Sequence, residues 1–600
     1  MPLAENAVCA LKDALYSGQV SLYFYEKYSS ECGSYVATKP TRDRIEKSVL
    51  KMDRKPVYDY LKHPYFSLAE EMFAEGYDDV FRAPMMNPST VVSQMKMDTA
   101  TGVVIRDLGI KKKNDFFLSS ECVSKLFDPT LFTTLPVWTI APKFEKLPFA
   151  EYVTDGKIRT FIIEPVESVF WRKVYFGGQN EAIVDKWHSA YGFNPYQGGV
   201  DKYARELLRF RRFWMFDGKG WDRIASWMGI VWKHRIKYMN SEDPRIKWLV
   251  SSILNQIMLS PWGDLLLRAY GNPSGSGTTT GDNILGMTLV TLLSLLIAAK
   301  GDVQAVKSCT WFRCFGDDNH GSDNLPCTDE ELRNAFIEGF ALFGIELDPL
   351  VITYDITELE FLGFRYCKHE CGSYIPKFPK DKLLTTFFYD LESLDPYCSF
   401  QKLESTLLMS LAHGPEFYND PRNEIICLGS FYTDPKIAKL IRDLPSYSTT
   451  LSWYLGYESV NFGPVVNFST RPRWLEEQNF NMEEPKFVKA EKRIKSLSEK
   501  VGVSADGQEW IKQCLDPFCD IPRRTVGEPD LITAGSVIQV VKKSMTIDVT
   551  GNEDVHIFLD TIDTPTMVCE QADYNEAGIY RPNNYQIDQN PTTVYRRGGL

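Results

Sequence analysis

The chain has 600 residues, roughly twice the length at which a single hydrophobic core stops growing, so we expect several domains. Its composition, 44% hydrophobic and 24% charged, is that of a globular protein and excludes a collagen-like, disordered or small disulfide-rich chain. The net charge is −12, from 67 Lys and Arg against 79 Asp and Glu. Binding to nucleic acid would therefore require basic residues concentrated in a channel.

The 13 cysteines are odd in number and have no repeated spacing, which favours free thiols in a cytosol-like compartment over a disulfide framework. The first five residues lack the basic region and apolar block of a signal peptide. The longest apolar stretch, residues 286–299, contains three hydroxyl side chains and is shorter than the roughly 20 residues that cross a bilayer. We expect it to be a buried helix and predict no transmembrane segment.

The first 200 residues are typical of irregular α/β structure with many loops. A basic stretch, 202–212, then precedes a strand-like run at 213–216, and a helical segment is predicted from residue 223 to about 238. A loop rich in Gly, Ser and Thr follows, then the long apolar helix and a second strand-like run at 310–315. This alternation predicts a mixed α/β fold in which helices pack on a sheet.

Residues 374–457 read as helices with aromatic packing, and residues 483–500 are dense in Lys and Glu, like a solvated helix or linker. We place a domain boundary near residue 490. Beyond it, short runs with β propensity at 536–541, 545–549 and 555–559 predict a β-rich C-terminal extension. Since residues 1 to about 500 contain their own apolar segments, we expect them to fold without this extension. The alternative is that the extension, with its many apolar residues, packs back onto the rest of the chain.

Adjacent acidic residues follow the second strand-like run, in Gly316-Asp317-Asp318. Two carboxylates on a tight turn suit a hard divalent ion such as Mg²⁺, which prefers oxygen ligands and retains some water for substrate phosphates. The tripeptide alone is weak, because composition would place it in about one chain of this length in seven.

A second acidic turn, from Asp217 to Asp222, follows the first strand-like run about a hundred residues earlier. If the two strands pair, Asp217 and Asp317 can share two metal ions about 3.5–4 Å apart, the arrangement that stabilises an in-line phosphoryl displacement. The alternative is that both residues of this turn mark the N-terminus of the following helix, where acidic groups are favoured.

The loop between these acidic turns, residues 271–283, carries four glycines, several hydroxyl side chains and Asn283. Such a loop can hold a template strand or a sugar with a flexible backbone and short polar groups. The alternative, a helix entry capped by Ser or Thr, explains the threonines but neither the glycines nor Asn283.

In this order, the three segments resemble motifs A, B and C of the RNA-dependent RNA polymerases of the picornavirus-like positive-strand RNA virus group. The motif B spacing, Ser-Gly-x-x-x-Thr-x-x-x-Asn, is matched by Ser274, Gly275, Thr279 and Asn283. Thr101 and Gly102 resemble motif G, Lys157 and Arg159 the end of motif F, and residues 360–364 motif E. The resemblance covers roughly residues 95–375.

The resemblance implies a right-hand polymerase fold. Its expected parts are fingers in residues 1–205, a palm in 206–372 with a finger insertion between motifs A and B, a helical thumb in 373–490, and a C-terminal extension of unassigned role in 491–600. The implied function is that of an RNA-directed RNA polymerase that copies viral RNA by two-metal nucleotidyl transfer. The implied cofactor is Mg²⁺, with Mn²⁺ as the alternative ion.

The implied partners are an RNA template, the nascent RNA strand, nucleoside triphosphates and other viral replication proteins. The implied location is the host cytoplasm, in membrane-associated replication complexes, after release from a polyprotein. The resemblance implies catalytic and metal-binding roles for Asp217, Asp317 and Asp318. The residues implied to bind the nucleotide are Lys157, Arg159, Asp222, Ser274, Gly275, Thr279 and Asn283, and those implied to bind RNA are Thr101, Gly102, Lys111, Lys112 and Lys113.

Asp222 and Asn283 match the family positions that sense the ribose 2′-hydroxyl. They disfavour a reverse transcriptase, which carries a bulky aromatic residue at the position of Asp222. The presence of all three candidate carboxylates disfavours a non-catalytic RNA-binding scaffold. For the lysine run at 111–113, a solvated charged surface is the alternative to RNA binding.

The chain departs from the family pattern in motif D, because no lysine lies between Lys307 and Lys368. We therefore assign no general acid, and for His320, the one nearby candidate, a core or turn position is the favoured interpretation. The cluster Cys367-Lys368-His369-Glu370-Cys371 supplies at most three zinc ligands where a structural site needs four. A β-hairpin turn at Gly372 is predicted there instead.

Overall fold

The structure is a computed structural model that describes residues 20–456 and two short segments, 538–541 and 546–549. The gaps within the first range are residues 33–34, 38–40, 53–55, 103–104, 106–108, 144, 149–150, 153–155, 241, 262–264, 270 and 390–395.

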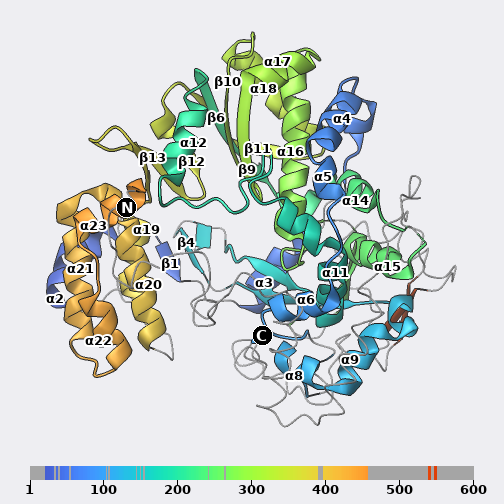
Figure 1. Cartoon of the computed structure of the whole chain (residues 1–600), viewed down its shortest axis with the longest axis horizontal. Helices are drawn as coiled ribbons and strands as arrows, with labels where there is room; N and C mark the ends of the chain where they lie inside the picture. The colour runs from blue at the N-terminus through green and yellow to red at the C-terminus, as the bar shows by residue number, and fades with distance from the viewer. Residues whose placement is uncertain are drawn as a thin grey trace.

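A four-stranded antiparallel sheet lies at the centre of the fold, in the order β11-β6-β10-β9 (Figure 1). Its strands are β6 (Arg212–Lys219), β9 (Thr310–Phe315), β10 (Asp318–Asp323) and β11 (Glu346–Thr353). The predicted strand at 310–315 is confirmed residue for residue. The strand predicted at 213–216 is longer than expected and continues through Asp217 to Lys219.

Helices cover one face of this sheet. On it lie α16 (Thr279–Ala298), α17 (Val303–Cys309) and α18 (Asp329–Ala341), and Phe336 of α18 packs on Trp214 and Phe216 with ring centroids 4.9 and 5.0 Å apart. The opposite face packs against α12 (Gly199–Leu207) and a small sheet of β12 (Glu360–Phe361), β13 (Phe364–Lys368) and β14 (Tyr374–Lys377). The central sheet is therefore buried on both sides.

The apolar helix α16 is a core helix, as predicted. It begins earlier than the apolar stretch does, so its 20 residues are long and apolar enough to cross a membrane, contrary to the length argument from the sequence. Its most apolar window is 94% buried inside the protein. This degree of burial identifies it as the core helix of the sheet rather than a membrane span.

The helical segment predicted from 223 to 238 is interrupted. It consists of α13 (Trp221–Ile224) and α14 (Met228–Ile236), with Ala225 between them at φ 38°. A left-handed residue cannot continue an α-helix, so the chain turns there.

A second sheet, in the order β5-β3-β7-β8, combines two distant parts of the chain. β3 (Val137–Pro142) and β5 (Thr160–Ile163) precede the central sheet, whereas β7 (Asn255–Leu259) and β8 (Leu265–Ala269) come from the segment between β6 and α16. β3 and β7 pair in parallel. Helix α4 (Phe66–Gly76) packs on α16. The remaining helices of this part of the chain are α5 (Asp78–Phe81), α6 (Pro88–Gln94), α8 (Lys113–Leu118), α9 (Ser120–Phe127), α11 (Val166–Ala182) and α15 (Pro244–Leu254).

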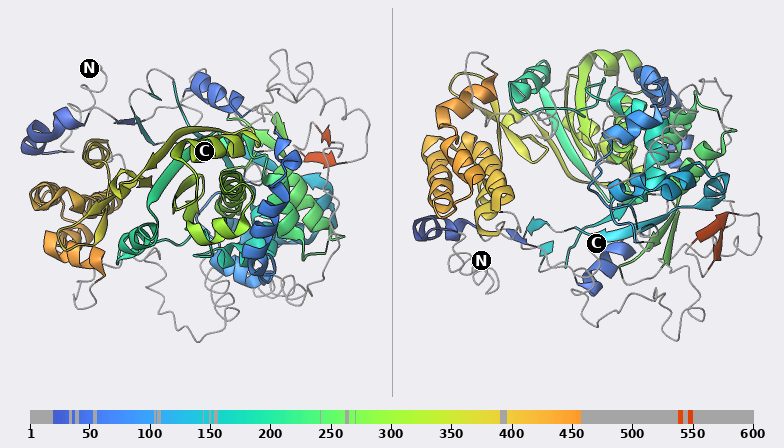
Figure 2. Two further views of the ribbon diagram at one scale, coloured as in Figure 1. Left: turned by 90° about the horizontal axis from the view of Figure 1, so that it is seen from above. Right: turned by 60° about the horizontal axis from the view of Figure 1, so that its bottom comes forward.

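A helical bundle lies at one end of the molecule, and the views in Figures 1 and 2 agree on this. It confirms the helices predicted in residues 374–457 from residue 380 to residue 455, whereas residues 374–377 form strand β14, contrary to the prediction. Its members are α19 (Lys380–Tyr389), α20 (Pro396–Met409), α21 (Pro415–Gly429), α22 (Pro435–Arg442) and α23 (Tyr447–Leu455). Single 3-10 turns occur at Ser29–Glu31, Asp59–Lys62, Pro129–Thr133, Ile356–Glu358 and Leu411–His413.

The N-terminal helix α2 (Leu22–Tyr28) packs on this bundle. The ring of Phe24 lies 4.9 Å from that of Phe387, and Ser21 donates its backbone N–H to Glu424 Oε1 at 2.6 Å. The chain then forms β1 (Tyr35–Ala37), which pairs with β4 (Lys146–Pro148), and α3 (Arg42–Leu50). The first described segment thus connects the bundle to the second sheet.

Two strands are described near the C-terminus, β15 (Ile538–Val541) and β16 (Thr546–Val549). They pair in antiparallel orientation, and β16 also pairs with β2 (Thr134–Leu135). The third run of β propensity, 555–559, lies outside the described residues.

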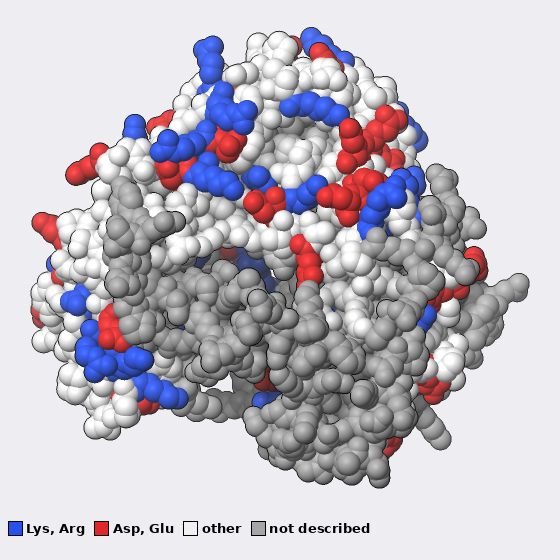
Figure 3. All heavy atoms as spheres, viewed as in Figure 1, with Lys and Arg blue, Asp and Glu red and all other residues white. Residues whose placement is uncertain are grey.

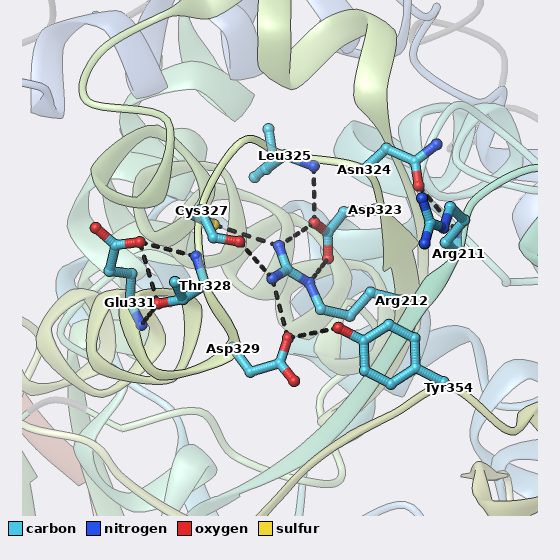
Figure 4. A network of polar contacts seen from close by, with 10 residues as sticks. All are labelled: Arg211, Arg212, Asp323, Asn324, Leu325, Cys327, Thr328, Asp329, Glu331 and Tyr354. Atoms are coloured by element: carbon cyan, nitrogen blue, oxygen red, sulfur yellow. Dashed lines mark hydrogen bonds and ion pairs between the residues drawn. The ribbon is translucent and has the colours of Figure 1, made fainter.

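Arg212 anchors the end of β6 that is farthest from Asp217 (Figure 4). The Arg212 side chain is 7% exposed and pairs with Asp323 at 2.5 Å. It also donates to the backbone oxygen of Cys327 at 2.8 Å and to Asp329 at 3.2 Å. One guanidinium therefore joins β6, the end of β10 and the start of α18.

The contact of α16 with Trp227 gives a test of this packing. A Cβ at Gly286 would lie 2.3 Å from Trp227, a fully buried ring stacked on Trp221. Because neither ring can move away freely, Gly286→Ala should destabilise the fold by about 1–3 kcal/mol and lower the Tm in thermal unfolding followed by tryptophan fluorescence. Gly229→Ala is the control, since no atom lies within 4 Å of its Cβ position in α14. An equal loss in both variants would contradict this account.

Candidate active site

Three carboxylates meet at one end of the central sheet. β6 and β10 are hydrogen-bonded neighbours, with Phe216 opposite Asn319, so the strand pairing expected from the sequence is confirmed. Continuing the same register by one residue places Asp217 opposite Asp318, the first residue of β10. Asp317 lies in the turn just before it. The sequence placed Asp217 and Asp318 in turns, whereas both belong to strands.

Desolvation and the closeness of the carboxylates raise the pKa values of two of them, Asp217 and Asp318. Desolvation, and then the negative charge of Asp317, raise the pKa of Asp217, although its side chain keeps contact with solvent. Burial, and then the same Asp317 charge, raise the pKa of Asp318 to about 7. Like charges at short range disfavour each other's ionised form. A cation bound here would relieve that repulsion.

The all-oxygen donor set suits Mg²⁺. Within the described part of the chain, however, no three His, Cys, Asp or Glu side chains converge closely enough to hold a metal ion by themselves. The carboxylates thus fit a metal that takes its remaining ligands from substrate and water.

The hairpin between β12 and β13 reaches this site. Its two-residue turn, Leu362-Gly363, has positive φ at both positions (51° and 75°), which matches the twist of the flanking strands. The backbone N–H of Leu362 donates to Asp318 Oδ2 at 3.0 Å. The segment that resembles motif E therefore fixes one of the three carboxylates.

Asp222 and Asn283 lie side by side. Asn283 donates its amide to Asp222 Oδ1 at 2.9 Å, and its Oδ1 accepts from Trp221 Nε1 at 3.1 Å and from Asn272 Nδ2 at 2.6 Å. Burial, and then the charge of Asp317, raise the pKa of Asp222 to about 6, against the opposing effect of Asn283. The sequence paired Asp222 with Asn283 but missed Trp221 and Asn272, which fix the orientation of the amide.

The loop before α16 rests on β5. A Cβ at Gly275 would lie 1.9 Å from the backbone oxygen of Ile162, so this close approach requires glycine. Ile162 donates its N–H to Ser274 Oγ at 3.4 Å, and Thr279 uses its hydroxyl within the loop, on the backbone oxygen of Pro273 at 2.5 Å. Gly275 and Thr279 thus shape the loop.

A cavity of about 500 Å³ opens beside this cluster. Three of the predicted nucleotide-binding residues line it, namely Arg159, Asp222 and Ser274. The sequence missed its other lining residues, which are Ser48, Met52, Lys143, Thr160, Phe161, Ile162, Arg223, Arg268 and Asn272. Four cations and one carboxylate therefore face one space, a combination suited to an anionic ligand that also carries hydroxyl groups.

The two predicted cations of the motif F segment differ in position. Arg159 pairs with Glu145 at 3.3 Å at the cavity wall, whereas Lys157 pairs with Glu151 at 2.5 Å and does not line the cavity. Both positive charges lower the pKa of Asp217, so both act on the carboxylate site.

The predicted RNA-binding residues lie away from the cavity lining. Thr101 is buried and donates its hydroxyl to the backbone oxygen of Ile110 at 2.7 Å, and Gly102 turns at φ 99° against Pro165. Lys111 and Lys112 are exposed, whereas Lys113 is half-buried, and burial lowers its pKa.

Two further expectations from the sequence are confirmed. His320 is fully buried and shares a 2.9 Å hydrogen bond with Tyr366, and burial lowers its pKa to about 3, so it is a core histidine. Residues 367–371 belong to the β13–β14 hairpin, with Gly372 at φ 90°.

Comparison with known proteins agrees with this geometry. Residues 16–433 match the profile of the family described as viral RNA-dependent RNA polymerase. The chain is 23% identical over 402 residues to the genome polyprotein of Tobacco vein mottling virus (64% of this chain, 13% of the relative). It is 25% identical over 417 residues to that of Brome streak virus (strain German) (64% and 41%), and 24% identical over 281 residues to the non-structural polyprotein 1AB of Turkey astrovirus 1 (42% and 17%).

Because the matched region exceeds half of the chain, the protein belongs to the viral RNA-dependent RNA polymerase family. The resemblance inferred from the sequence is confirmed. The chain spans less than half the length of each of these relatives.

The pKa of Asp318 predicts a pH effect on stability in metal-free buffer. A carboxyl whose pKa rises on folding, here from 3.8 to about 7, stabilises the fold in its protonated form, and that contribution is lost as pH rises through about 7. Asp318→Asn should therefore raise the Tm, by an amount that grows between pH 5 and pH 8. The exposed Glu330→Gln is the control. A Tm difference between Asp318→Asn and the wild type that stays constant across this range would contradict the raised pKa of Asp318.

Proposed function

We propose that this chain is an RNA-directed RNA polymerase that copies viral RNA by two-metal nucleotidyl transfer of ribonucleotides. The observation that carries the proposal is the pairing of β6 with β10, which brings three carboxylates together. These carboxylates interact with the cavity lining, since Arg159 lowers the pKa of Asp217 and Asp317 raises that of Asp222. Primer extension by the purified protein, with ribonucleotides or deoxyribonucleotides and with or without Mg²⁺, is the direct test.

Asp217, Asp317 and Asp318 would hold the metal ions. When bound, Mg²⁺ would supply Lewis acidity to the reacting phosphate oxygens, with Mn²⁺ as an alternative ion. In the reaction a 3′-hydroxyl attacks the α-phosphate and pyrophosphate leaves. The carboxylates would act in their ionised form, so protons would compete with the metal ions for these oxygens, and the metal concentration needed for activity should rise as the pH falls.

The cavity would receive the nucleoside triphosphate. Arg159 offers a planar fork for a phosphate, and Lys143, Arg223 and Arg268 add positive charge to the same space. Lys157 acts on the site through its charge. Asp222, held by Asn283, would accept a hydrogen bond from the ribose 2′-hydroxyl, which deoxyribose lacks.

The positive charge that would bind the nucleotide is gathered at the cavity, where Lys143, Arg159, Arg223 and Arg268 line one space. On the face shown in Figure 3, the described Lys and Arg side chains are interspersed with Asp and Glu. This agrees with the requirement, set by the net charge of −12, that cations be concentrated where the ligand binds. Thr101, Gly102 and Lys111, Lys112 and Lys113 would line template entry.

The domain assignment follows from the same proposal. Fingers would comprise residues 1–205, the palm 206–372 and the thumb 373–490, and the C-terminal extension 491–600 would be β-rich. In support, β7 and β8 join the sheet of β3 and β5, as a finger insertion would, and residues 380–455 form a helical bundle. The chain would arise from a polyprotein and act with other viral replication proteins in membrane-associated complexes of the host cytoplasm.

Neutralising Asp317 tests the carboxylate site. Asp317 is exposed in a turn, and its charge repels Asp217 and Asp318, so Asp317→Asn should not lower the Tm and should reduce primer extension by about 10³-fold. Asp348→Asn is the control, because Asp348 is an exposed carboxylate paired with Lys219 at 2.8 Å and lies outside the proposed ligand set. Extension by Asp317→Asn at near wild-type rates would refute the assignment.

Removing the Asn283 amide tests ribose selection. Asn283→Ala removes the amide that donates to Asp222 Oδ1 at 2.9 Å, so the carboxylate is no longer held in the orientation that would accept from the ribose 2′-hydroxyl. The ratio of ribonucleotide to deoxyribonucleotide incorporation should fall by about tenfold or more. An unchanged ratio, measured in competition at saturating template, would show that selection resides elsewhere.

A further inference from the structure

Arg268 lies on β8 directly beside the backbone of Asp222. Its side chain is buried, with a residue exposure of 7%, and lines the cavity. Nη2 donates to the backbone oxygen of Asp222 at 2.9 Å and to that of Arg223 at 3.3 Å, while Nη1 donates to Gln256 Oε1 at 3.4 Å. The guanidinium thus connects strands β7 and β8 to the short helix α13.

The two backbone oxygens need such a partner. Helix α13 spans only Trp221–Ile224, and left-handed residues, Gly220 at φ 72° and Ala225 at φ 38°, stand at its two ends. A helix of one turn cannot satisfy its own final carbonyls, so other groups must do so. Arg268 supplies donors for two of them, and Asn272 adds its N–H to the oxygen of Asp222 at 2.8 Å.

The surroundings are shaped to the arginine fork. A Cβ at Gly271 would lie 1.9 Å from Arg268 Nη2, so only glycine leaves room for the guanidinium. Gln256 accepts the hydrogen bond from Arg268 Nη1. Its own amide nitrogen donates to the backbone oxygens of Ile253 and Gly271, each at 2.8 Å, which fixes its side chain. The guanidinium therefore has a fixed position relative to the loop that precedes α16.

We infer that Arg268 is a positioning residue for ribose selection. It orients the Asp222 carboxylate by hydrogen-bonding the backbone oxygens of Asp222 and Arg223 in α13. The inference rests on the proposed function, since it concerns how the polymerase would recognise the 2′-hydroxyl. Asn283 holds the carboxylate itself through a side-chain hydrogen bond, and Arg268 holds the main chain of the same residue.

Lysine cannot replace this arrangement. Its ammonium is a single point of donation on a flexible chain, whereas the planar guanidinium reaches two carbonyls and a side-chain amide at once. Arg268→Lys keeps the positive charge next to Asp222 but loses the fork. A loss of selection in this variant therefore reports position rather than charge.

Arg212→Lys is the matched control. Arg212 is also a buried arginine whose fork joins separate elements, but it lies at the far end of β6 (Figure 4). Both variants should lower the Tm, because each leaves buried acceptors without a donor. The two variants should differ only in ribose selection, because only Arg268 would position a residue of the ribose site.

The experiment measures the ratio of ribonucleotide to deoxyribonucleotide incorporation, together with kcat and KM for each, in the wild type, Arg268→Lys and Arg212→Lys. We expect the ratio to fall about tenfold in Arg268→Lys and to stay at the wild-type value in Arg212→Lys. An unchanged ratio in Arg268→Lys, or an equal fall in Arg212→Lys, would overturn the inference alone. A wild-type protein that extends no primer would overturn the proposed function, and this inference with it.

Should Arg268→Lys fail to fold, Gln256→Met provides the second test. Methionine has nearly the same volume as glutamine but lacks its amide oxygen. Arg268 would therefore remain in place but lose the hydrogen bond that Nη1 donates. We expect a smaller fall of the ratio, about threefold. A ratio equal to that of the wild type in Gln256→Met would then count against the inference.

Discussion

The pairing of β6 with β10 is the constraint on which the candidate site depends. It brings Asp217 opposite Asp318 and next to Asp317, an arrangement that like charges oppose in the absence of a cation. The sheet withstands this repulsion because its stability comes from elsewhere. Trp214 and Phe216 pack on α18, and the buried Arg212–Asp323 pair joins the same two strands at the opposite end. The aromatic core thus allows one end of the sheet to remain electrostatically unfavourable and so ready for a metal.

A second group of contacts surrounds Asp222. Its side chain is fixed by Asn283, whose own orientation is set by Trp221 and Asn272. Every polar atom of the Asn283 amide therefore has a defined partner, which excludes a rotated amide. A buried amide whose oxygen and nitrogen both have partners favours a single geometry, and a site that must distinguish ribose from deoxyribose requires one.

The sequence predicted those features that local patterns determine. Strand β9 and most of the C-terminal helices followed from apolar runs. The pairing of the two acidic segments was a condition of the two-metal hypothesis, and the motif B spacing of Ser274, Gly275, Thr279 and Asn283 supported the family resemblance. The break at Ala225 was missed because nothing in an alanine indicates a left-handed turn. The cavity residues Ser48, Lys143 and Arg268 were missed for another reason. They come from three segments that are 95 and 125 residues apart in the chain, and only the tertiary structure brings them together.

The contact between α2 and the helical bundle also affects how the molecule is made. Ser21 and Glu424, which hydrogen-bond at 2.6 Å, are 403 positions apart in the chain. During synthesis at about 5–20 residues per second, the helix that leaves the ribosome early must wait on the order of tens of seconds for the surface that covers Phe24. In that interval its aromatic face has no native partner, so this segment is where we would look for chaperone binding to the nascent chain. The docking of α2 would then be among the late steps of folding and would close the chain into its native arrangement.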